Sequence, residues 1–333
     1  MKYSEKELIN YIQQHCHSAD HNLVQGIGDD CAVFKLTPGK LGLVTTDTLI
    51  EGVHFDPLWH PPELLGRKTA SVNLSDIAAM GATPRFALLS LALTDEVACE
   101  WIDCFMEGFL AVLKEHDVSL IGGDTVRSRG HSMFSVTVTG EAAGDQILYR
   151  SGARKGDCVF VSGWLGEAAA GLELCRKNIQ PKKESWQQLI EAHLNPVPLV
   201  GLGLVLAQSG LVSAMMDISD GLATDLAHLC LSSGVGAEIR QADIPISAAV
   251  HEAAGFVNQT ALTLAIKGGE DYQLLFTAAA SNSEQLVKTV HERTSRVIYP
   301  IGEIIAGNGV FLCRDFHREE ISFQGYDHFE APL

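Results

Sequence analysis

Six short segments of this chain place an acidic residue beside glycine, serine or threonine. They are GIGDD (26–30), TTD (45–47), NLSD (73–76), GGDT (122–125), DISDG (217–221) and GGED (268–271). Carboxylate and hydroxyl oxygens are hard ligands of the kind that Mg²⁺ takes, and glycines let backbone N–H groups approach a ligand closely. Together the segments suggest a site where several Mg²⁺ ions hold a polyphosphate.

Asp76 is the most informative single residue, because its neighbours Leu74, Ile77 and Ala78 are apolar. A lone carboxylate in apolar surroundings is costly unless it is paired or bound to a metal. An ion pair with Arg67 or Lys68, earlier on the same predicted helix, is the alternative. We favour metal ligation because the other five segments offer ligands for the same ion.

Asp47 and Asp217 each follow an apolar run that predicts a strand, at 41–46 and 212–216. Ligands of α/β proteins bind at the carboxyl ends of strands, although a helix cap or an Asx turn would explain Asp47 alone. Asp220 can face the same way as Asp217 at the start of the following helix. The loop is not an EF-hand, because its glycine comes too early and its twelfth position is not glutamate.

Several common motifs are absent from the chain. Residues 26–30 lack the third glycine of a dinucleotide fingerprint, and there is neither a P-loop nor a protein-kinase motif. No G-x-S-x-G elbow supports a Ser-His-Asp triad, and His54 is unremarkable among 13 histidines. Residues 163–166 would offer N–H groups to an anion at a strand–helix junction, but a plain turn is the simpler interpretation.

The composition limits the class of protein. The 333 residues, 46% hydrophobic and 20% charged, suit a soluble protein of two domains. The net charge of −17 argues against nucleic acid and means that a phosphate substrate needs bridging cations. With no apolar run near the ~18 residues of a membrane span, no signal peptide and no C-x-x-C pair, we expect a cytoplasmic protein with reduced thiols and no structural zinc.

Helical and strand patterns alternate and predict an α/β fold of two α+β domains, with mixed sheets flanked by helices. Helices are expected at 4–15, 63–80, 97–116, 166–175 and 222–231, and strands at 41–46, 118–121, 133–139, 158–162, 212–216, 262–266 and 272–277. The polar, turn-rich stretch at 149–157 marks a domain boundary. It predicts domains at 1–148 and 149–333.

In order along the chain, these segments resemble the thiamine-monophosphate kinases of the aminoimidazole-ribonucleotide-synthetase-like superfamily. The matching pieces are GIGDDCAVF (26–34), TTDTLIEGVHF (45–55), VNLSDIAAMGATP (72–84), LIGGDT (120–125), RSG (150–152), DISDGL (217–222), GGEDY (268–272) and GYDHF (325–329). They cover nearly the whole chain. The resemblance implies that the N-terminal domain binds metal and nucleotide and forms a homodimer, and that the C-terminal domain completes the active site.

The resemblance also implies an activity and a set of site residues. Members transfer the γ-phosphate of ATP to thiamine monophosphate by direct in-line attack, assisted by several Mg²⁺ ions. The implied metal ligands are Asp30, Thr45, Thr46, Asp47, Asp76, Asp124, Asp217 and Asp220. The implied nucleotide contacts are Gly123, Asp124, Arg150 and Ser219, and the implied thiamine contacts are His54, Glu270 and Phe323. Asp30, Asp47, Asp217 and Arg150 are expected to carry the catalysis.

The implied chemistry suits a chain rich in carboxylates. The acceptor is itself a phosphate with a second pKa of about 6, so it needs no general base. Metal ions bring the two polyanions together and align the attack, and Arg150 is the expected basic contact to the transferring phosphates. The chain departs from the family at Asn195 and Leu199, where basic residues are usual, at 115–116, where an aromatic residue is usual, and at Phe323, which is often Trp.

Two alternatives remain open. The first is another ATP-using enzyme of the superfamily, such as aminoimidazole-ribonucleotide synthetase, although its substrate motifs are not evident. The second is a non-catalytic regulator that binds Mg²⁺ and nucleotide. A reactive cysteine in a glycine-rich N-terminus, as in selenophosphate synthetase, and a C-terminal cysteine, as in hydrogenase-maturation relatives, are both missing from the sequence.

Overall fold

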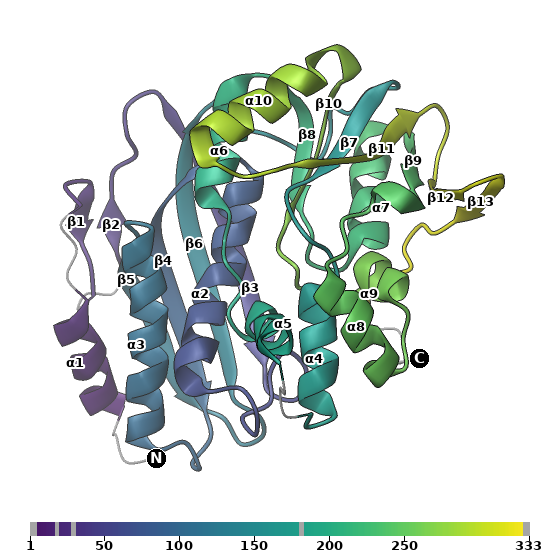
Figure 1. Cartoon of the computed structure of the whole chain (residues 1–333). Helices are drawn as coiled ribbons and strands as arrows, with labels where there is room; N and C mark the ends of the chain where they lie inside the picture. Colours follow the sequence, from purple (N-terminus) through teal and green to yellow (C-terminus); the bar gives the residue numbers. More distant parts are fainter. Residues whose placement is uncertain (1–4, 17–19, 28–30, 180–182, 329–333) are drawn as a thin grey trace. The chain divides into compact units, whose positions relative to one another are not determined.

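The chain divides into two units (Figure 1). The computed structural model describes residues 5–16, 20–27, 31–179 and 183–328. The N-terminal unit comprises residues 1–77 and 82–145, and the C-terminal unit comprises residues 78–81 and 146–333. Each unit combines helices with a mixed sheet, which confirms the α/β class. None of the described helices is long and apolar enough to cross a membrane.

The N-terminal unit contains a four-stranded sheet in the order β3-β6-β4-β5. Neighbouring strands are antiparallel except β4 and β5, which are parallel. The strands are β3 (Lys40–Ile50), β4 (Thr83–Leu93), β5 (Ser119–Arg127) and β6 (Met133–Ala143). A separate pair joins β1 (Leu23–Gln25) to β2 (Val33–Phe34), and the helices are α1 (Glu5–His15), α2 (Pro62–Ala79) and α3 (Cys99–Glu115).

Helices α2 and α3 lie side by side on one face of this sheet (Figure 1). Phe105 of α3 stacks on Phe134 of β6, with ring centroids 4.5 Å apart. The two helices touch through glycine, since a Cβ on Gly66 would lie 1.9 Å from a backbone oxygen of α3, and one on Gly108 would lie 1.9 Å from a backbone oxygen of α2. This close packing fixes α2, which carries the NLSD segment.

The C-terminal unit is built on a seven-stranded sheet in the order β13-β12-β9-β11-β7-β10-β8, in which only β12 and β9 pair in parallel. The strands are β7 (Asp157–Val161), β8 (Val212–Asp217), β9 (Gly236–Arg240), β10 (Leu274–Ala279), β11 (Tyr299–Ile305), β12 (Val310–Arg314) and β13 (His317–Glu320). The helices are α4 (Glu167–Arg176), α5 (Glu184–Leu194), α6 (Val200–Ser209), α7 (Leu222–Ser233), α8 (Ala248–Val257), α9 (Ala261–Lys267) and α10 (Ser283–Thr294), with 3₁₀ turns η1 (Gln241–Asp243) and η2 (Ala280–Asn282).

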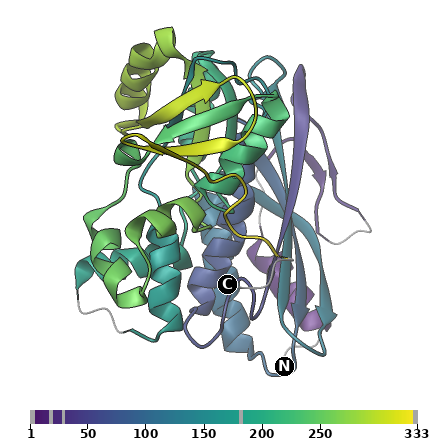
Figure 2. The same ribbon diagram turned by 90° about the vertical axis from the view of Figure 1, so that its right-hand side faces the viewer.

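Both faces of this sheet are buried. Val159 and Val161 of β7 point into the core that includes Leu226 of α7. Side chains alternate along a strand, so Phe160 lies on the other face, where it stacks on Phe276 at 5.5 Å. Helices α4, α5, α8 and α9 pack on one another and form a group beside one end of the strands (Figure 2).

Two sequence predictions about these elements are wrong. Residues 262–266, predicted as a strand, belong to helix α9, whose first turn is capped by Thr260 accepting the N–H of Thr263 at 3.0 Å. A short apolar run cannot be assigned to helix or strand by periodicity alone. Asp47 was expected just beyond a strand end, but β3 continues to Ile50, because its edge pairs with β6 along the full length of both strands.

Candidate active site

In the N-terminal unit, the TTD segment of β3 lies beside the NLSD segment of α2. The hydroxyl of Thr45 donates a hydrogen bond to Oδ2 of Asp76. The N–H of Asp47 donates to Oδ1 of Asn73 at 3.0 Å. Arg67, one alternative partner for Asp76, instead forms an ion pair with Glu115 at 3.1 Å. Two predicted metal-ligand segments are therefore joined by direct contacts.

Thr46 and His54 are placed differently from Thr45. The hydroxyl of Thr46 donates to the carbonyl of Val136 at 3.0 Å, and alternation along the strand puts it on the face opposite to Thr45. His54 follows β3, and its Nδ1 accepts the N–H of Ile50 at 3.1 Å. The Thr46 hydroxyl is thus not gathered with the Thr45–Asp76 pair. Asp30, the remaining predicted ligand of this part of the chain, lies outside the described residues.

Gly123 and Asp124 lie on β5, at the opposite edge of the sheet from β3. Three strand spacings separate the two edges by about 14 Å. Gly123 is in the same row of the sheet as Asp47, and a Cβ on it would lie 1.9 Å from the carbonyl oxygen of Leu89. The Asp124 side chain is exposed, and its Oδ1 accepts the N–H of Thr125 at 2.9 Å. The glycine is required by packing, and the aspartate faces solvent.

In the C-terminal unit, several predicted segments meet at one loop, residues 217–221, which we call the DISDG loop. Three of its neighbours donate backbone hydrogen bonds to it: Glu270 to Ser219 at 2.7 Å, Tyr272 to Ile218 at 2.8 Å, and Tyr326 to Asp220 at 2.9 Å. Asp217, the last residue of β8, is only 3% exposed. The structure therefore brings the predicted nucleotide and metal residues of this loop next to the GGED segment and the C-terminal GYDHF segment.

Asp225, in the first turn of α7, is a site residue that the sequence reasoning missed. Its Oδ2 accepts the N–H groups of Ser219 and Asp220, each at 3.1 Å. Burial raises the pKa of Asp225 to about 8, and the negative charges of Asp217 and Asp220 contribute. A carboxylate in the apolar run 222–231 is the signal that also singled out Asp76, and it would have found this residue.

Burial also raises the pKa of Asp220, against the opposing effects of His328, His228 and Arg150. The carboxyl groups of Asp217, Asp220 and Asp225 lie close enough to affect one another, and a group of carboxylates favours a bound cation. Within the described residues, no group of three or more His, Cys, Asp or Glu side chains is arranged to hold a metal ion. The loop therefore has carboxyl groups that suit a cation, but its described residues alone do not form a complete set of metal ligands.

Arg150 is exposed and precedes β7. Its carbonyl accepts a hydrogen bond from the Ser233 hydroxyl at 3.2 Å, and the Ser233 oxygen in turn accepts the N–H groups of Gly152 and Ala153 at 3.2 Å. The end of α7 thus fixes the backbone that carries Arg150. Its charge acts on the Asp220 carboxyl, which places the predicted phosphate contact near the DISDG loop.

Glu270 and Phe323, the predicted thiamine contacts of this unit, both have positive φ, at 68° and 55°. Phe323 is 52% exposed, and its ring packs edge-on against His228 with centroids 5.2 Å apart. It is not buried beneath the C-terminal segment. Oε2 of Glu270 lies 2.9 Å from Nδ1 of His193, a buried residue of α5 that the sequence did not single out.

The turn at 163–166 already holds an anion from the protein itself. The carboxylate of Asp271 accepts the N–H of Gly166 at 2.6 Å and that of Ala168 at 3.1 Å. Burial raises the pKa of Asp271 to about 7, while these N–H groups oppose the rise. The N-terminus of α4 is therefore anchored to the GGED segment, in agreement with the simpler interpretation of this turn.

Two of the departures from the family pattern, Asn195 and Leu199, have structural roles here. Asn195 caps the end of α5, where its N–H donates to the carbonyl of Glu191 and its side chain donates to the Glu191 carboxylate, both at 2.8 Å. Leu199 is buried just before α6. These positions contribute to packing and to helix termination.

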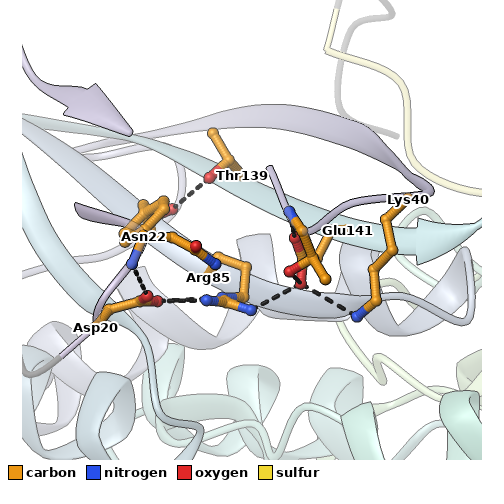
Figure 3. Close-up of polar contacts among 8 residues, drawn as sticks. Asp20, Asn22, Lys40, Arg85, Thr139 and Glu141 are labelled. Carbon is orange, nitrogen blue, oxygen red and sulfur yellow. Dashed lines mark hydrogen bonds and ion pairs between the residues drawn. The ribbon is translucent and has the colours of Figure 1, made fainter. Parts of the chain in front are cut away.

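A separate group of charged residues ties the segment around β1 and β2 to the N-terminal sheet (Figure 3). Glu141, which is 2% exposed, contacts Arg85 at 2.7 Å and Lys40 at 3.1 Å, and Arg85 also contacts Asp20 at 2.6 Å. Burial alone would raise the pKa of Glu141, but hydrogen bonds from Thr37 and Lys40 and the charge of Arg85 outweigh it, so the pKa is lowered. The sequence did not predict this network.

Comparison with known proteins identifies the family. Two family models match the chain: AIR synthase related protein, N-terminal domain, over residues 28–142, and AIR synthase related protein, C-terminal domain, over residues 154–313. The thiamine-monophosphate kinase of Buchnera aphidicola subsp. Acyrthosiphon pisum is 38% identical over 333 residues, covering 99% of this chain and 100% of the relative. The chain belongs to the thiamine-monophosphate kinase family.

Solved structures agree with membership of this family. Thiamine-monophosphate kinase from Stenotrophomonas maltophilia K279a matches with a TM-score of 0.81 and 37% identity, over 93% of this chain and 96% of that one. AaThiL complexed with AMPPCP and TMP matches with a TM-score of 0.74 and 34% identity, over 94% of this chain and 95% of that one. The predicted fold of two AIR-synthase-like domains is confirmed. The members of this family are enzymes of the thiamine-phosphate kinase class.

Proposed function

We propose that this chain transfers the γ-phosphate of ATP to thiamine monophosphate, giving thiamine diphosphate and ADP. The observation that carries the proposal is the DISDG loop, where Ser219 accepts a hydrogen bond from the N–H of Glu270 and Asp220 accepts one from Tyr326, close to Phe323 in the sequence. The DISDG loop therefore holds together residues that are expected to bind the nucleotide and residues that are expected to bind the acceptor. The complex of the relative AaThiL with AMPPCP and TMP supports the same pair of substrates.

The donor atoms of the predicted metal ligands fit Mg²⁺, because all of them are carboxylate or hydroxyl oxygens. Burial, followed by the nearby carboxylates of Asp217 and Asp220, raises the pKa of Asp225, which supports a site where several carboxyl groups lie close together. We propose as ligands Asp30, Thr45, Asp47, Asp76, Asp124, Asp217 and Asp220. The predicted ligand Thr46 is not among them, because its hydroxyl bonds to Val136 on the other face of β3. When bound, Mg²⁺ ions would neutralise phosphate charge and favour in-line attack.

The chain's own residues bind and orient the substrates. Gly123, Asp124, Arg150 and Ser219 are proposed to contact the nucleotide, with Arg150 on the transferring phosphates. His54, Glu270 and Phe323 are proposed to contact thiamine monophosphate, since a flat cationic ring system suits an aromatic face and a carboxylate. Asp30, Asp47, Asp217 and Arg150 are proposed as the residues on which the rate depends most.

Incubation with Mg·ATP and thiamine monophosphate tests the activity. The expected products are ADP and thiamine diphosphate in equal amounts. Release of ADP without thiamine diphosphate would favour another ATP-using enzyme of the superfamily. Binding of Mg·ATP with neither product formed would favour a regulator.

A rapid-quench experiment tests whether the transfer is direct. Because the acceptor phosphate is already a nucleophile, no side chain needs to be phosphorylated. With γ-labelled ATP and no thiamine monophosphate, we expect no labelled protein. A stoichiometric phosphoprotein that passes its label to thiamine monophosphate would instead show a two-step reaction.

We also propose a cytoplasmic homodimer that pairs through its N-terminal strands. Leu41 and Val44, on the edge strand β3, are 54% and 72% exposed, and apolar side chains on an open edge favour association. All eight cysteines are free thiols, which suits a reducing compartment. Light scattering of wild type and Val44→Glu tests the dimer: the variant should be monomeric, and an unchanged dimer would move the interface elsewhere.

A further inference from the structure

The turn that carries Glu270 has an unusual backbone. Glu270 and Tyr272 both have positive φ, at 68° and 47°. Residues with a Cβ avoid this region, so two of them so close together make a costly turn. The other described non-glycine residues with positive φ are isolated in the sequence: Asp117, Asn178, Asn258, Ser295, Asp315 and Phe323. Strain of this kind persists only where the surroundings fix it, and it clusters at functional sites.

The main chain of this turn is fixed from two sides. The N–H groups of Glu270 and Tyr272 donate to the DISDG loop at 2.7 and 2.8 Å. Between them, the Asp271 carboxylate holds the first turn of α4. Gly269 packs so closely that a Cβ would lie 2.5 Å from the carbonyl oxygen of Ser219. These contacts determine the backbone but leave the direction of the Glu270 side chain to a different partner.

That partner is His193, in the last turn of α5. Its Nδ1 lies 2.9 Å from Oε2 of Glu270, and its side chain is 1% exposed whereas that of Glu270 is 23% exposed. The two atoms are within ion-pair distance, and a buried ring changes position less readily than a surface one. The carboxylate therefore has one oxygen against a rigid group while part of the side chain still faces solvent.

A purely structural explanation would make Glu270 the acceptor that satisfies a buried histidine. That role needs no strained backbone, because many ordinary positions offer a carbonyl or carboxylate. The positive φ of Glu270, fixed by the hydrogen bond from its main-chain N–H to the carbonyl of Ser219, is instead the kind of strain that clusters at functional sites.

We propose that His193 is a positioning residue that fixes the Glu270 carboxylate for the thiamine ring system; this inference rests on the proposed function. Holding a glutamate in one orientation before the substrate arrives removes part of the ordering cost of binding. Loss of His193 should therefore weaken binding of thiamine monophosphate, with little effect on ATP.

The kinetic test compares three histidine variants. His193→Leu should raise the KM for thiamine monophosphate about tenfold, with kcat and the KM for ATP nearly unchanged. His193→Asn, which keeps an N–H donor near the position of Nδ1, should recover most of the loss. His60→Leu is the matched control, because His60 is also 1% exposed but belongs to the N-terminal unit; it should lower the melting temperature without changing either KM.

A double-mutant cycle separates positioning from packing. If His193 acts through Glu270, His193→Leu combined with Glu270→Gln should have the same KM for thiamine monophosphate as Glu270→Gln alone. Effects that multiply, or equal changes in both KM values, would overturn the proposal. If His193→Leu does not fold, His193→Gln, which stays polar and closer in size, takes its place in the cycle.

Crystal structures without substrate give a test that does not depend on activity. We expect a single Glu270 conformer in the wild type and more than one in His193→Leu. Ordered Glu270 in both proteins would overturn the inference while leaving the proposed function intact. If Glu270 is disordered in His193→Leu but the wild type makes no thiamine diphosphate, the proposed function is contradicted, whereas the positioning of Glu270 by His193 is supported.

Discussion

Two buried carboxylates, Glu141 in the N-terminal unit and Asp225 in the C-terminal unit, have pKa values shifted in opposite directions. Burial raises the pKa of both groups. At Glu141, hydrogen bonds from Thr37 and Lys40 and the charge of Arg85 outweigh burial, and the pKa is lowered. At Asp225, the nearby charges come from Asp217 and Asp220, and the pKa rises to about 8.

We interpret Glu141 as a structural residue and the carboxylates at the DISDG loop as part of the functional site. Glu141 is provided with cations by its own chain and ties together segments that are far apart in sequence. At the DISDG loop, burial and neighbouring carboxylates raise the pKa of Asp225, and carboxyl groups with pKa values shifted in this way cluster at functional sites. We infer that this loop relies on a cation from solution, and the following predictions test the distinction in order of expected effect.

The largest effect is expected from Asp217→Asn. Loss of this carboxylate should lower kcat by about 10²–10³-fold or more, whereas removing one of several like charges should leave the metal-free melting temperature unchanged or higher. Steady-state assays and thermal unfolding of the same preparations measure both. A variant with near-normal kcat would show that Asp217 is not required for the reaction.

Arg85→Met should show the opposite pattern. It leaves the buried Glu141 without its Arg85 contact. Breaking a buried ion pair costs about 3–5 kcal/mol when the remaining charge is unpaired, and the loss here should be smaller because Lys40 still contacts Glu141. Urea unfolding should show that loss of stability, whereas kcat at low temperature should stay close to wild type. Arg85→Lys, which keeps a charge, should fall between the two. If stability were unchanged, the network in Figure 3 would have no structural role.

Phe323→Ala tests an exposed contact with a smaller expected effect. A face-on aromatic contact to a cationic ring contributes about 1–2 kcal/mol, so the KM for thiamine monophosphate should rise roughly tenfold. The KM for ATP and the melting temperature should change little, because Phe323 is 52% exposed. A large fall in melting temperature with both KM values shifted would assign Phe323 to the core.

The smallest expected effect is a difference in pH dependence between Asp271 and Glu141. The folded pKa of Asp271, about 7, is raised, so its contribution to stability is present at low pH and is lost as pH rises from about 4 towards 7. The pKa of Glu141 is lowered, so its contribution is present above the unfolded pKa and lost as pH falls through the folded value.

Urea unfolding from about pH 3 to pH 7 measures this difference, because the change at Glu141 falls below its unfolded pKa of about 4.3. The wild-type advantage in stability over Asp271→Asn should shrink as pH rises, and the advantage over Glu141→Gln should shrink as pH falls. Parallel curves for the two variants would show that the two carboxylates have similar environments, and would remove the basis of the comparison.

Two helices were predicted with nearly their observed bounds. The helices expected at 63–80 and 222–231 correspond to α2 (Pro62–Ala79) and α7 (Leu222–Ser233). Strand β13 (His317–Glu320) was missed because all of its side chains are exposed, so no apolar alternation marks it, and its conformation comes from pairing with β12. Strand β11 was missed because Pro300 and Gly302 interrupt its apolar pattern.

The site was predictable as chemistry but not as geometry. The acidic segments identified the residue types, and DISDG and GGED do meet through Ser219 and Glu270. The contact of His193 with Glu270 joins two distant parts of the chain, and no local pattern encodes such a pair. Asp225 could have been identified from the sequence, because it is a carboxylate in an apolar run. The Glu141 network could not, because it depends on tertiary packing.

The most direct test of the central claim is the dependence of the kinase rate on free Mg²⁺ at saturating ATP and thiamine monophosphate. If carboxylates such as Asp217 bind Mg²⁺ in addition to the ion carried by ATP, the rate should keep rising after all ATP is present as Mg·ATP. Asp217→Asn should lose that second phase, and Glu141→Gln should keep it. A full rate at one Mg²⁺ per ATP, with the same curve for Asp217→Asn, would contradict the account.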